Sequence, residues 1–300
     1  MNSLTLKHLR YFAALAKYRH FAKAADVCAI SQPALSLQIK QLEEIAGAPL
    51  VERNTRNVQL TALGKVIAER AIHVLQDVDE IGDTLRAARD ELAGPFHLGV
   101  IPTIAPYLLP TLFEQMAQTF PKLDLVVREA TTAVLVEELQ AGSLDAAIVA
   151  LPISEPTLKE ARLFTESFVL VRPKAERGRP LPDFKALSEL RLLLLEEGHC
   201  FRDQALAFCA IDEGCYRNIM DGSSLTTLVQ LVAAGVGITL IPEMARRVET
   251  SLADVDVVSF PDPQPKRIIG MVWRKTSPLE DHLVSMSEVI RTASEALYET

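Results

Sequence analysis

Hydrophobic residues recur at near-helical spacing in the first 60 residues of the chain. One group, at intervals of three residues, is Leu6, Leu9, Phe12 and Leu15, and a second group is Phe21, Ala24 and Ala25. Such spacing is typical of short amphipathic helices that bury one face. We therefore expect a small helical domain at the start of the chain.

Residues 62–92 carry one long helical pattern with hydrophobic residues at both core positions of a heptad repeat. One row is Ile67, Val74, Ile81 and Ala88, and the other, offset by four positions, is Ala71, Val78, Leu85 and Leu92. A single short segment cannot cover such a stripe, so the pattern predicts a partner helix, most simply from a second copy of the chain. A helix packed on its own domain is the alternative.

After Gly94-Pro95, which should end the long helix, strands alternate with helices. The expected strands are Phe96–Ile101, Leu123–Glu129, Asp145–Val149, Phe168–Val171, Arg191–Leu195, Tyr216–Met220, Gly237–Ile241, Asp256–Phe260 and Ile268–Arg274. The expected helices are Leu108–Phe120, Thr132–Ala141, Phe201–Ile211, Ser224–Ala234 and Pro278–Tyr298. This alternation predicts an α/β fold with ligands at the carboxyl ends of strands, and its length favours two lobes.

Charge separates the two parts of the chain. The whole chain of 300 residues has a net charge of −8, but residues 1–62 hold eight basic and four acidic side chains. A basic end on an acidic body indicates that only the first domain meets a polyanion, although ordinary surface variation would look similar.

Hydropathy and cysteine content indicate the compartment. No hydrophobic run reaches the roughly 18 residues that a transmembrane helix needs, and the start of the chain lacks the hydrophobic region of a signal peptide. We therefore expect a soluble, cytoplasmic protein without a membrane partner. In that reducing compartment the four cysteines should remain thiols.

The segment from Phe21 to Glu43 predicts a helix-turn-helix. Its first helix is rich in alanine, and Ser31 is a strong candidate for the N-cap of the second, with Pro33 in the first turn. Leu35, Ile39 and Leu42 should form the buried stripe. Polar residues on the other faces could read base edges, and a turn-rich stretch after them suits a wing on the phosphate backbone. The candidate DNA contacts are Ser31, Gln32, Pro33, Ser36, Gln38, Lys40, Arg53 and Arg56.

This stretch, from Leu6 to Gly64, resembles the winged helix-turn-helix of LysR-type transcriptional regulators. The resemblance extends over the chain and implies a DNA-binding domain (1–62), a linker and dimerisation helix (63–94) and a bilobed, periplasmic-binding-protein-like α/β regulatory domain (95–300). It also implies a homodimer or homotetramer on double-stranded promoter DNA, with RNA polymerase as a further partner.

Two cysteines stand nine residues apart in the run from Gly198 to Cys209. Their spacing is not that of a metal or thioredoxin motif, and no histidine cluster accompanies them, so we expect no metal and no cofactor. Cys200 should lie at or near the start of a helix, where the helix dipole and nearby Arg202 favour the thiolate. A solvent-accessible thiolate can attack peroxide and become a sulfenic acid.

The same run resembles the peroxide-sensing OxyR subfamily of LysR-type regulators. The resemblance implies that Cys200 is the peroxidatic cysteine and Cys209 the resolving one. It also implies that Thr103, Thr132 and His199 line a peroxide pocket, and that Arg202 and Asp203 orient or polarise Cys200. Nine residues of continuous helix span roughly 13 Å, whereas disulfide Cα atoms lie within about 7 Å. A Cys200–Cys209 bond would therefore require local refolding.

Other interpretations stay open at this point. A LysR-type regulator could instead bind a small-molecule effector between its lobes, with both cysteines inert. A thiol peroxidase would leave the DNA-binding module unexplained, so we expect no enzymatic activity. Cys215 could compete with Cys209 as a resolving partner, although a buried small side chain is the simpler interpretation.

Overall fold

The computed structural model describes residues 4–53, 58–87, 92–182, 187, 190–208, 224–295 and 297. The chain forms two compact units, Met1–Leu85 and Arg86–Thr300. No helix within these described ranges is long and apolar enough to cross a membrane.

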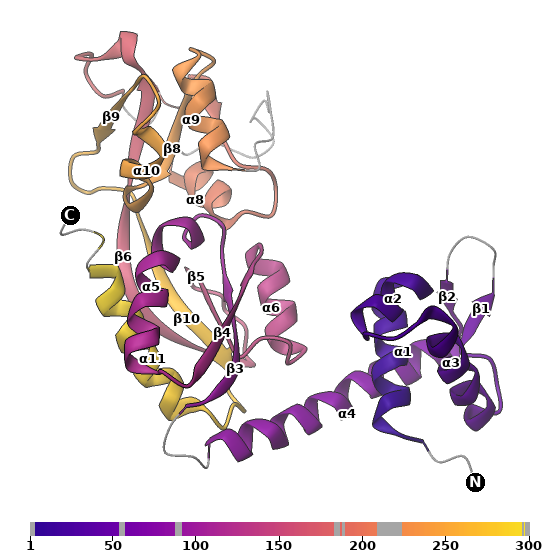
Figure 1. The fold of residues 1–300 in the computed structure, drawn as a ribbon. Helices are drawn as coiled ribbons and strands as arrows, with labels where there is room; N and C mark the ends of the chain where they lie inside the picture. Colours follow the sequence, from indigo (N-terminus) through magenta and orange to yellow (C-terminus); the bar gives the residue numbers. More distant parts are fainter. Residues whose placement is uncertain are drawn as a thin grey trace. The chain divides into compact units, whose positions relative to one another are not determined.

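The first unit is helical with a short hairpin, as Figure 1 shows in indigo and violet. Its elements are α1 (Leu6–Tyr18), α2 (Phe21–Val27), α3 (Gln32–Ala46), β1 (Val51–Arg53), β2 (Val58–Leu60) and α4 (Ala62–Ala87). Strands β1 and β2 pair antiparallel, with Val51 opposite Leu60. This order is that of a winged helix-turn-helix, as the sequence predicts.

The expected hydrophobic stripes meet in one core. Phe12 and Leu15 of α1 pack with Leu35, Ile39 and Leu42 of α3, and all five are buried. Helix α4 joins this core at its start, and the backbone there is so close that only glycine fits. A Cβ on Gly64 would lie 2.0 Å from the carbonyl oxygen of Leu50.

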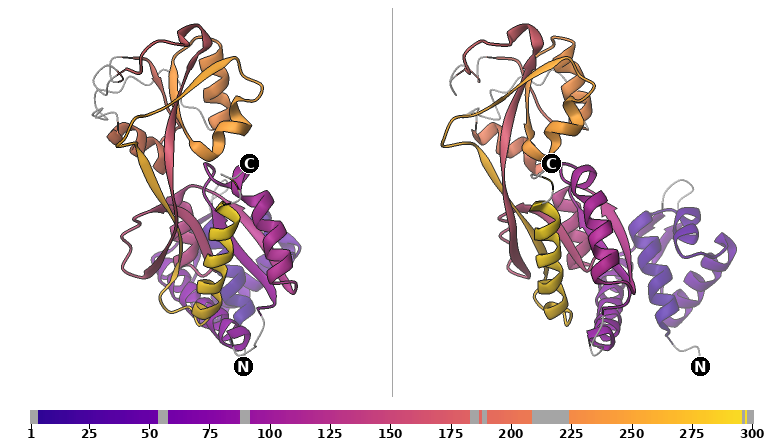
Figure 2. Two further views of the ribbon diagram at one scale, coloured as in Figure 1. Left: turned by 90° about the vertical axis from the view of Figure 1, so that its left-hand side faces the viewer. Right: turned by 60° about the vertical axis from the view of Figure 1, so that its left-hand side comes forward.

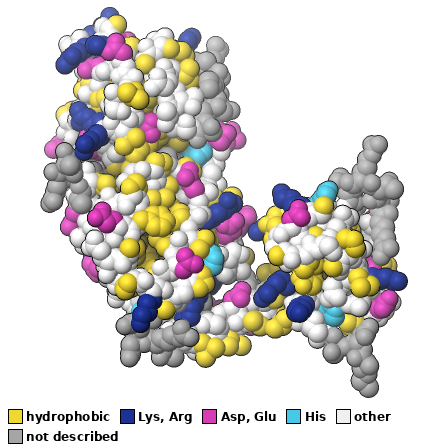
Figure 3. Space-filling model, in the orientation of Figure 1, with side chains coloured by type: hydrophobic (Ala, Val, Ile, Leu, Met, Phe, Trp, Pro, Cys, Tyr) yellow, Lys and Arg dark blue, Asp and Glu magenta, His cyan; other side chains and the backbone are white. Residues whose placement is uncertain are grey.

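The heptad seam of α4 is largely unpartnered in the single chain. Figure 3 shows hydrophobic side chains on the surface of this helix. Val74, Ile81 and Leu85 are exposed, whereas Ala71 is buried. The expectation for Leu92 was wrong, because this residue lies beyond the helical end at Ala87 and belongs to the core of the second unit.

The second unit is built on a mixed sheet in the order β4-β3-β5-β10-β6-β8-β7, with β9 also paired to β6. Figures 1 and 2 show two lobes joined by the long strands β6 and β10. The strands are β3 (Gly94–Val100), β4 (Leu123–Glu129), β5 (Ala146–Leu151), β6 (Leu158–Pro173), β7 (Leu192–Leu193), β8 (Ile238–Pro242), β9 (Val255–Ser259) and β10 (Lys266–Arg274).

Helices cover both lobes. Helices α5 (Ala105–Thr119), α6 (Thr132–Gln140) and α11 (Glu280–Glu295) belong to one lobe, which we call lobe I. Helices α8 (Cys200–Phe208), α9 (Leu225–Ala233) and α10 (Arg246–Thr250), with the 3-10 turn η3 (Glu243–Ala245), belong to the other, lobe II. A second 3-10 turn, η1 (Lys174–Glu176), follows β6.

Strand β6 is much longer than the sequence predicts. Only Phe168–Val171 stands out as hydrophobic, but the strand starts at Leu158 and runs through both lobes. Its first part pairs with β10, and its last part pairs with β8 and β9. The charged side chains of the first part hide it from a hydrophobic pattern. The expected strand Tyr216–Met220 lies outside the described residues.

Candidate functional site

Helix α3 presents a polar face at its start. Ser31 is its N-cap, and the hydroxyl accepts a hydrogen bond from the Ala34 N–H at 3.3 Å. Because Leu35, Ile39 and Leu42 fix the buried side, the opposite side faces solvent. The candidate DNA contacts that are exposed in this stretch are Ser31, Gln32, Pro33, Ser36 and Lys40, and Ala34 and Leu37 are exposed among them.

The remaining candidate DNA contacts differ in their surroundings. Gln38 is half-buried, and its amide donates to Gln41 Oε1 at 2.9 Å. Arg53 is the last residue of β1 and pairs with Val58, the first residue of β2, but its side chain and all of Arg56 lie outside the described residues. The structure therefore brings the α3 candidates Ser31, Gln32, Pro33, Ser36 and Lys40 together on one exposed surface, whereas the expected contacts of Arg53 and Arg56 stay predictions.

Cys200 is the first residue of α8, in agreement with the sequence prediction. The loop before it turns at Gly198, whose φ of +93° is in the left-handed region that favours glycine. Arg202 is buried and donates to the Leu195 carbonyl at 3.1 Å, which fixes this loop. Cys200 itself is half-buried, with a free thiol at the positive end of the helix dipole.

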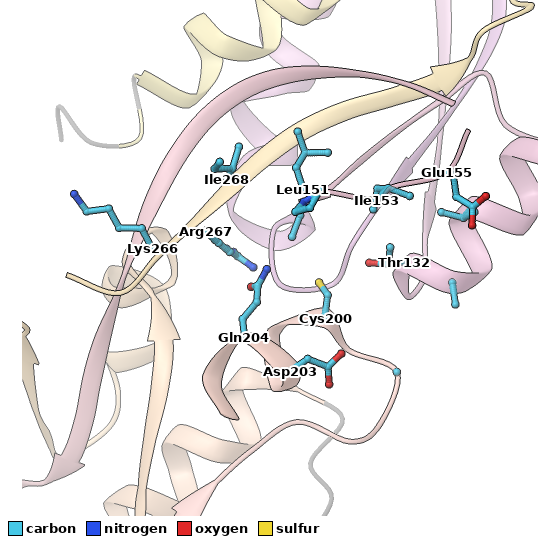
Figure 4. A pocket seen from close by; sticks show the side chains of 15 residues that line it. Thr132, Leu151, Ile153, Glu155, Cys200, Asp203, Gln204, Lys266, Arg267 and Ile268 are labelled. Atoms are coloured by element: carbon cyan, nitrogen blue, oxygen red, sulfur yellow. The ribbon is translucent and has the colours of Figure 1, made fainter. Parts of the chain in front are cut away.

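A cleft of about 760 Å³ opens beside Cys200. In Figure 4 the sulfur points into this cleft, with Arg267 and Gln204 on one side and Thr132 on the other. The cleft is lined by residues of both lobes: Thr132, Ala133, Val136, Ala150, Leu151, Pro152, Ile153, Glu155, Gly198, Cys200, Asp203, Gln204, Lys266, Arg267 and Ile268.

Two buried polar atoms at the cleft have no hydrogen-bond partner in the part of the chain that the structure describes. The hydroxyl of Thr132 and Oε1 of Gln204 form no hydrogen bond among the described residues. Buried polar atoms in folded proteins nearly always have a partner, so an unpaired pair around one cavity indicates a site for a small polar molecule. Asp203 also lines the cleft, and Figure 4 shows its side chain on the same helix as Cys200.

Arg267 is a site residue that the sequence analysis missed. Its guanidinium is completely buried and contacts Glu166, also completely buried, at 2.7 Å. Nη1 donates to the Thr103 hydroxyl at 2.8 Å, and Nη2 donates to the Thr103 carbonyl at 3.1 Å. The guanidinium carbon lies 5.4 Å from the centroid of the Phe201 ring, next to Cys200.

Thr103 and His199 line a second, smaller cavity instead of the cleft. This cavity has a volume of about 100 Å³ and also contains Tyr107 and Glu249. His199 Nε2 lies 3.8 Å from Glu196 Oε1. Of the residues expected in one pocket, Thr132 and Asp203 line the cleft and Thr103 and His199 line the smaller cavity, and Thr103 connects to the cleft through Arg267. Arg202 lines neither cavity, because its guanidinium donates to the Leu195 carbonyl.

Some of the redox expectations cannot be placed. Cys209 and Cys215 lie outside the described residues. Among the residues that the structure describes, no cluster of three histidine, cysteine or acidic side chains could hold a metal ion. Gln204, which the sequence analysis did not select, lies one helical turn after Cys200, and that spacing could have signalled its place on the same face.

Two family models match the chain. Residues 6–65 match the bacterial regulatory helix-turn-helix protein of the lysR family, and residues 89–294 match the LysR substrate binding domain. Together these two matches include the α3 face and the cleft.

Individual relatives agree with the family models. The DNA-binding transcriptional dual regulator OxyR of Escherichia coli K12 is 40% identical over 296 residues, covering 96% of this chain and 95% of the relative. Full-length OxyR from Pseudomonas aeruginosa has a similar structure, with a TM-score of 0.74, 34% identity and coverage of 96% and 95% of the two chains. A hydrogen-peroxide-bound mutant of Corynebacterium glutamicum OxyR matches with a TM-score of 0.68 and 34% identity, covering 98% of this chain and 93% of that chain.

Proposed function

This chain belongs to the LysR family of bacterial regulatory helix-turn-helix proteins, and we propose that it is a transcriptional regulator that senses hydrogen peroxide through Cys200. The observation that carries this proposal is the thiol of Cys200 at a cleft that also holds a buried arginine and the oxygens of Thr132 and Gln204, which have no hydrogen-bond partner among the described residues. Relatives named as hydrogen peroxide-inducible activators support it.

The chemical step is a two-electron oxidation of the Cys200 sulfur. The thiolate attacks one peroxide oxygen, a sulfur–oxygen bond forms, and the O–O bond breaks. The second oxygen leaves as hydroxide and takes a proton to become water. Cys200 is oxidised to a sulfenic acid while peroxide is reduced. Because negative charge develops on the departing oxygen, a fixed guanidinium nearby stabilises the transition state.

The surroundings fit a small molecule that both donates and accepts hydrogen bonds. The Thr132 hydroxyl can donate or accept, and Gln204 Oε1 can accept a peroxide hydrogen. Arg267 can only donate. Together these groups are suited to hold one peroxide oxygen near the sulfur and to stabilise the other as it departs.

The second step in this proposal is a disulfide between Cys200 and Cys209. The Cys209 thiolate attacks the sulfenic sulfur, and hydroxide leaves and takes a proton to become water, so the pair loses two electrons in total. Cys200 begins α8, which continues to Phe208. The Cα atoms of cysteines nine residues apart along a helix lie about twice as far apart as the Cα atoms of a disulfide can. Bond formation therefore requires α8 to unwind or shift, and this change is the proposed switch.

The DNA-binding unit supplies the output. The exposed α3 face, from Ser31 to Lys40, would enter the major groove of promoter DNA, and Arg53 and Arg56 would contact phosphates. The exposed hydrophobic seam of α4 supports a homodimer as the building block of a homotetramer. We further propose that oxidation changes how the assembly engages RNA polymerase at oxidative-stress genes, and that the protein acts as a stoichiometric switch instead of an enzyme.

The proposal is tested by peptide mapping after treatment of the reduced protein with one equivalent of hydrogen peroxide. We expect a Cys200–Cys209 linkage in the wild type, none in Cys200→Ser, and an unchanged linkage in the matched control Cys215→Ser. Cys200→Ser should also abolish the change in promoter activity caused by peroxide.

Two results would contradict this function. A dominant Cys209–Cys215 or intermolecular product would remove the assigned pair. A full peroxide response in Cys200→Ser would favour a small-molecule effector in the cleft, with both cysteines inert.

A further inference from the structure

We propose that Glu166 is a positioning residue for the peroxide reaction, because it fixes the direction in which the Arg267 guanidinium presents its N–H groups to the cleft. This inference rests on the proposed function, since it assigns a role within the same site. Glu166 lies on β6 and Arg267 on β10, the two strands that join the lobes.

Both oxygens of the Glu166 carboxylate are occupied. Oε2 accepts from Arg267 Nε at 2.8 Å and lies 2.7 Å from Nη2. Oε1 accepts from the backbone N–H of Met244 in η3 at 3.0 Å. The carboxylate is completely buried, so water does not compete for these bonds. Glu166 therefore has one fixed orientation, which is set by the backbone of lobe II.

The donors of Arg267 can be followed one by one. Of the five N–H groups of an arginine, Nε and one on Nη2 face Glu166, while the second on Nη2 and one on Nη1 face Thr103. This leaves one N–H on Nη1 without a partner among the described residues. Arg267 lines the cleft that holds Cys200. The proposal assigns this remaining N–H to a molecule bound in the cleft.

The hydrogen bonds to Thr103 alone would not fix this geometry. Thr103 lies between β3 and α5 of lobe I, and it holds only the Nη end of the guanidinium. Glu166 holds the Nε side and compensates the buried positive charge, which would otherwise favour a solvated rotamer. Arg267 also lies over the ring of Phe201, the residue after Cys200. If the Arg267 side chain turned away, its remaining N–H would no longer face the cleft. The side chain would also lose its contact with Phe201 of α8.

The test compares two reactions of Cys200 in the full-length reduced protein, each followed by rapid quenching and mass spectrometry of the Cys200 peptide. Oxidation by hydrogen peroxide needs a donor for the departing oxygen, whereas alkylation by iodoacetamide needs only a reactive, accessible sulfur. In Glu166→Gln we expect peroxide oxidation to slow by about tenfold or more while alkylation changes by less than about twofold.

A matched control removes another carboxylate from the same sheet. Arg172 lies on β6, as Glu166 does, and its Nε contacts Asp256 Oδ2 at 2.8 Å, away from the residues that line the cleft. Asp256→Asn should leave both rates of Cys200 within about twofold of wild type. Equal peroxide rates in Glu166→Gln and wild type would overturn the inference, and so would equal slowing of both reactions, which would show general distortion.

A second variant keeps the test decisive if Glu166→Gln does not fold. The double variant Glu166→Gln/Arg267→Met removes both buried charges. Replacing both members of a buried ion pair destabilises a protein less than removing one member and leaving the other charge unpaired. If Glu166 acts through Arg267, the double variant should oxidise at the same rate as Arg267→Met alone. A further loss in the double variant would contradict the positioning role. If hydrogen peroxide does not oxidise Cys200 of the wild type in preference to the other cysteines, the result contradicts the proposed function itself and not only the role of Glu166.

Discussion

The proposed DNA-reading face and the proposed peroxide site are built in opposite ways. The candidate base contacts lie within ten consecutive residues at the start of α3, on the outside of an apolar core. The proposed peroxide site combines Thr132, Cys200 and Arg267 from separate segments, and Thr103 reaches it through its hydrogen bond with Arg267. The Arg267 side chain is fixed by a completely buried ion pair with Glu166. Apart from the N-cap Ser31, residues of the first kind can change without disturbing the fold beneath them. Residues of the second kind carry chemistry and stability together.

The largest expected effect tests whether chemistry and stability are joined at Arg267. Arg267→Met should slow the oxidation of Cys200 by about 100-fold, the usual cost of losing a donor to a developing oxyanion. It should also lower the free energy of unfolding of the second unit by about 3–5 kcal/mol, because Glu166 stays buried without its partner. Quenched oxidation kinetics measure the first quantity. Urea unfolding followed by fluorescence of Trp273, the one tryptophan of the sequence, measures the second.

Arg172→Met separates the two effects. Arg172 is also buried, and it pairs with Asp256 within the same sheet but outside the cleft. We expect Arg172→Met to lower the free energy of unfolding, as Arg267→Met does. Its Cys200 should nevertheless be oxidised by peroxide at close to the wild-type rate. If Arg172→Met slowed oxidation as much as Arg267→Met, destabilisation would explain both results and the contrast between chemistry and packing would be lost.

A smaller effect is expected on the exposed face of α3. Gln32→Ala should weaken specific DNA binding by about 1–3 kcal/mol, the range for one amide contact to a base edge. Because Gln32 is exposed, the free energy of unfolding should change by no more than about 0.5 kcal/mol. Binding titrations on promoter and unrelated DNA at fixed salt would measure the loss of discrimination. If binding to promoter DNA and to unrelated DNA weakened equally, Gln32 would contact the DNA backbone instead of a base edge.

The same contrast explains what the sequence could reveal. The N-cap at Ser31, the stripe through Leu35 and Ile39, and the position of Cys200 at the start of α8 are local features, and the structure agrees with each. Their causes, capping and helical periodicity, act within a few residues.

The buried network has no such local signal. Glu166 and Arg267 are 101 positions apart, and Thr103 and Arg267 are 164 apart. A charged residue in a strand looks like a surface residue until the pairing of β6 with β10 is known. For the same reason the hydrophobic pattern did not predict the first part of β6. The sequence also could not predict that Thr103 and His199 line a smaller cavity instead of the cleft.

The smallest expected effect concerns Tyr107 of lobe I and Glu249 of lobe II, which resemble the Arg267 network in being buried and polar. The Tyr107 hydroxyl donates to Glu249 Oε1 at 2.6 Å. Burial raises the pKa of Tyr107 well above its usual range, and the hydrogen bond to Glu249 and its negative charge raise it further. The folded protein therefore favours the neutral phenol. The resulting stabilisation is complete below the ordinary tyrosine pKa of about 10 and declines as the pH rises above it.

Tyr107→Phe should cost about 1–2 kcal/mol at pH 7, because the buried Glu249 carboxylate loses its donor. The difference from wild type should shrink above pH 10, where the unfolded wild-type chain ionises Tyr107 and the variant has no such group. Urea unfolding reported by Trp273 at pH 7 and pH 10.5 measures both values, and Tyr18→Phe in the first unit supplies the same chemical change where no effect on this transition is expected. A stability difference that stayed constant with pH would mean that Tyr107 contributes by packing and not through its hydrogen bond to Glu249. Buried hydrogen-bonded polar groups would then stabilise the second unit at Arg267 and its partners but not at Tyr107.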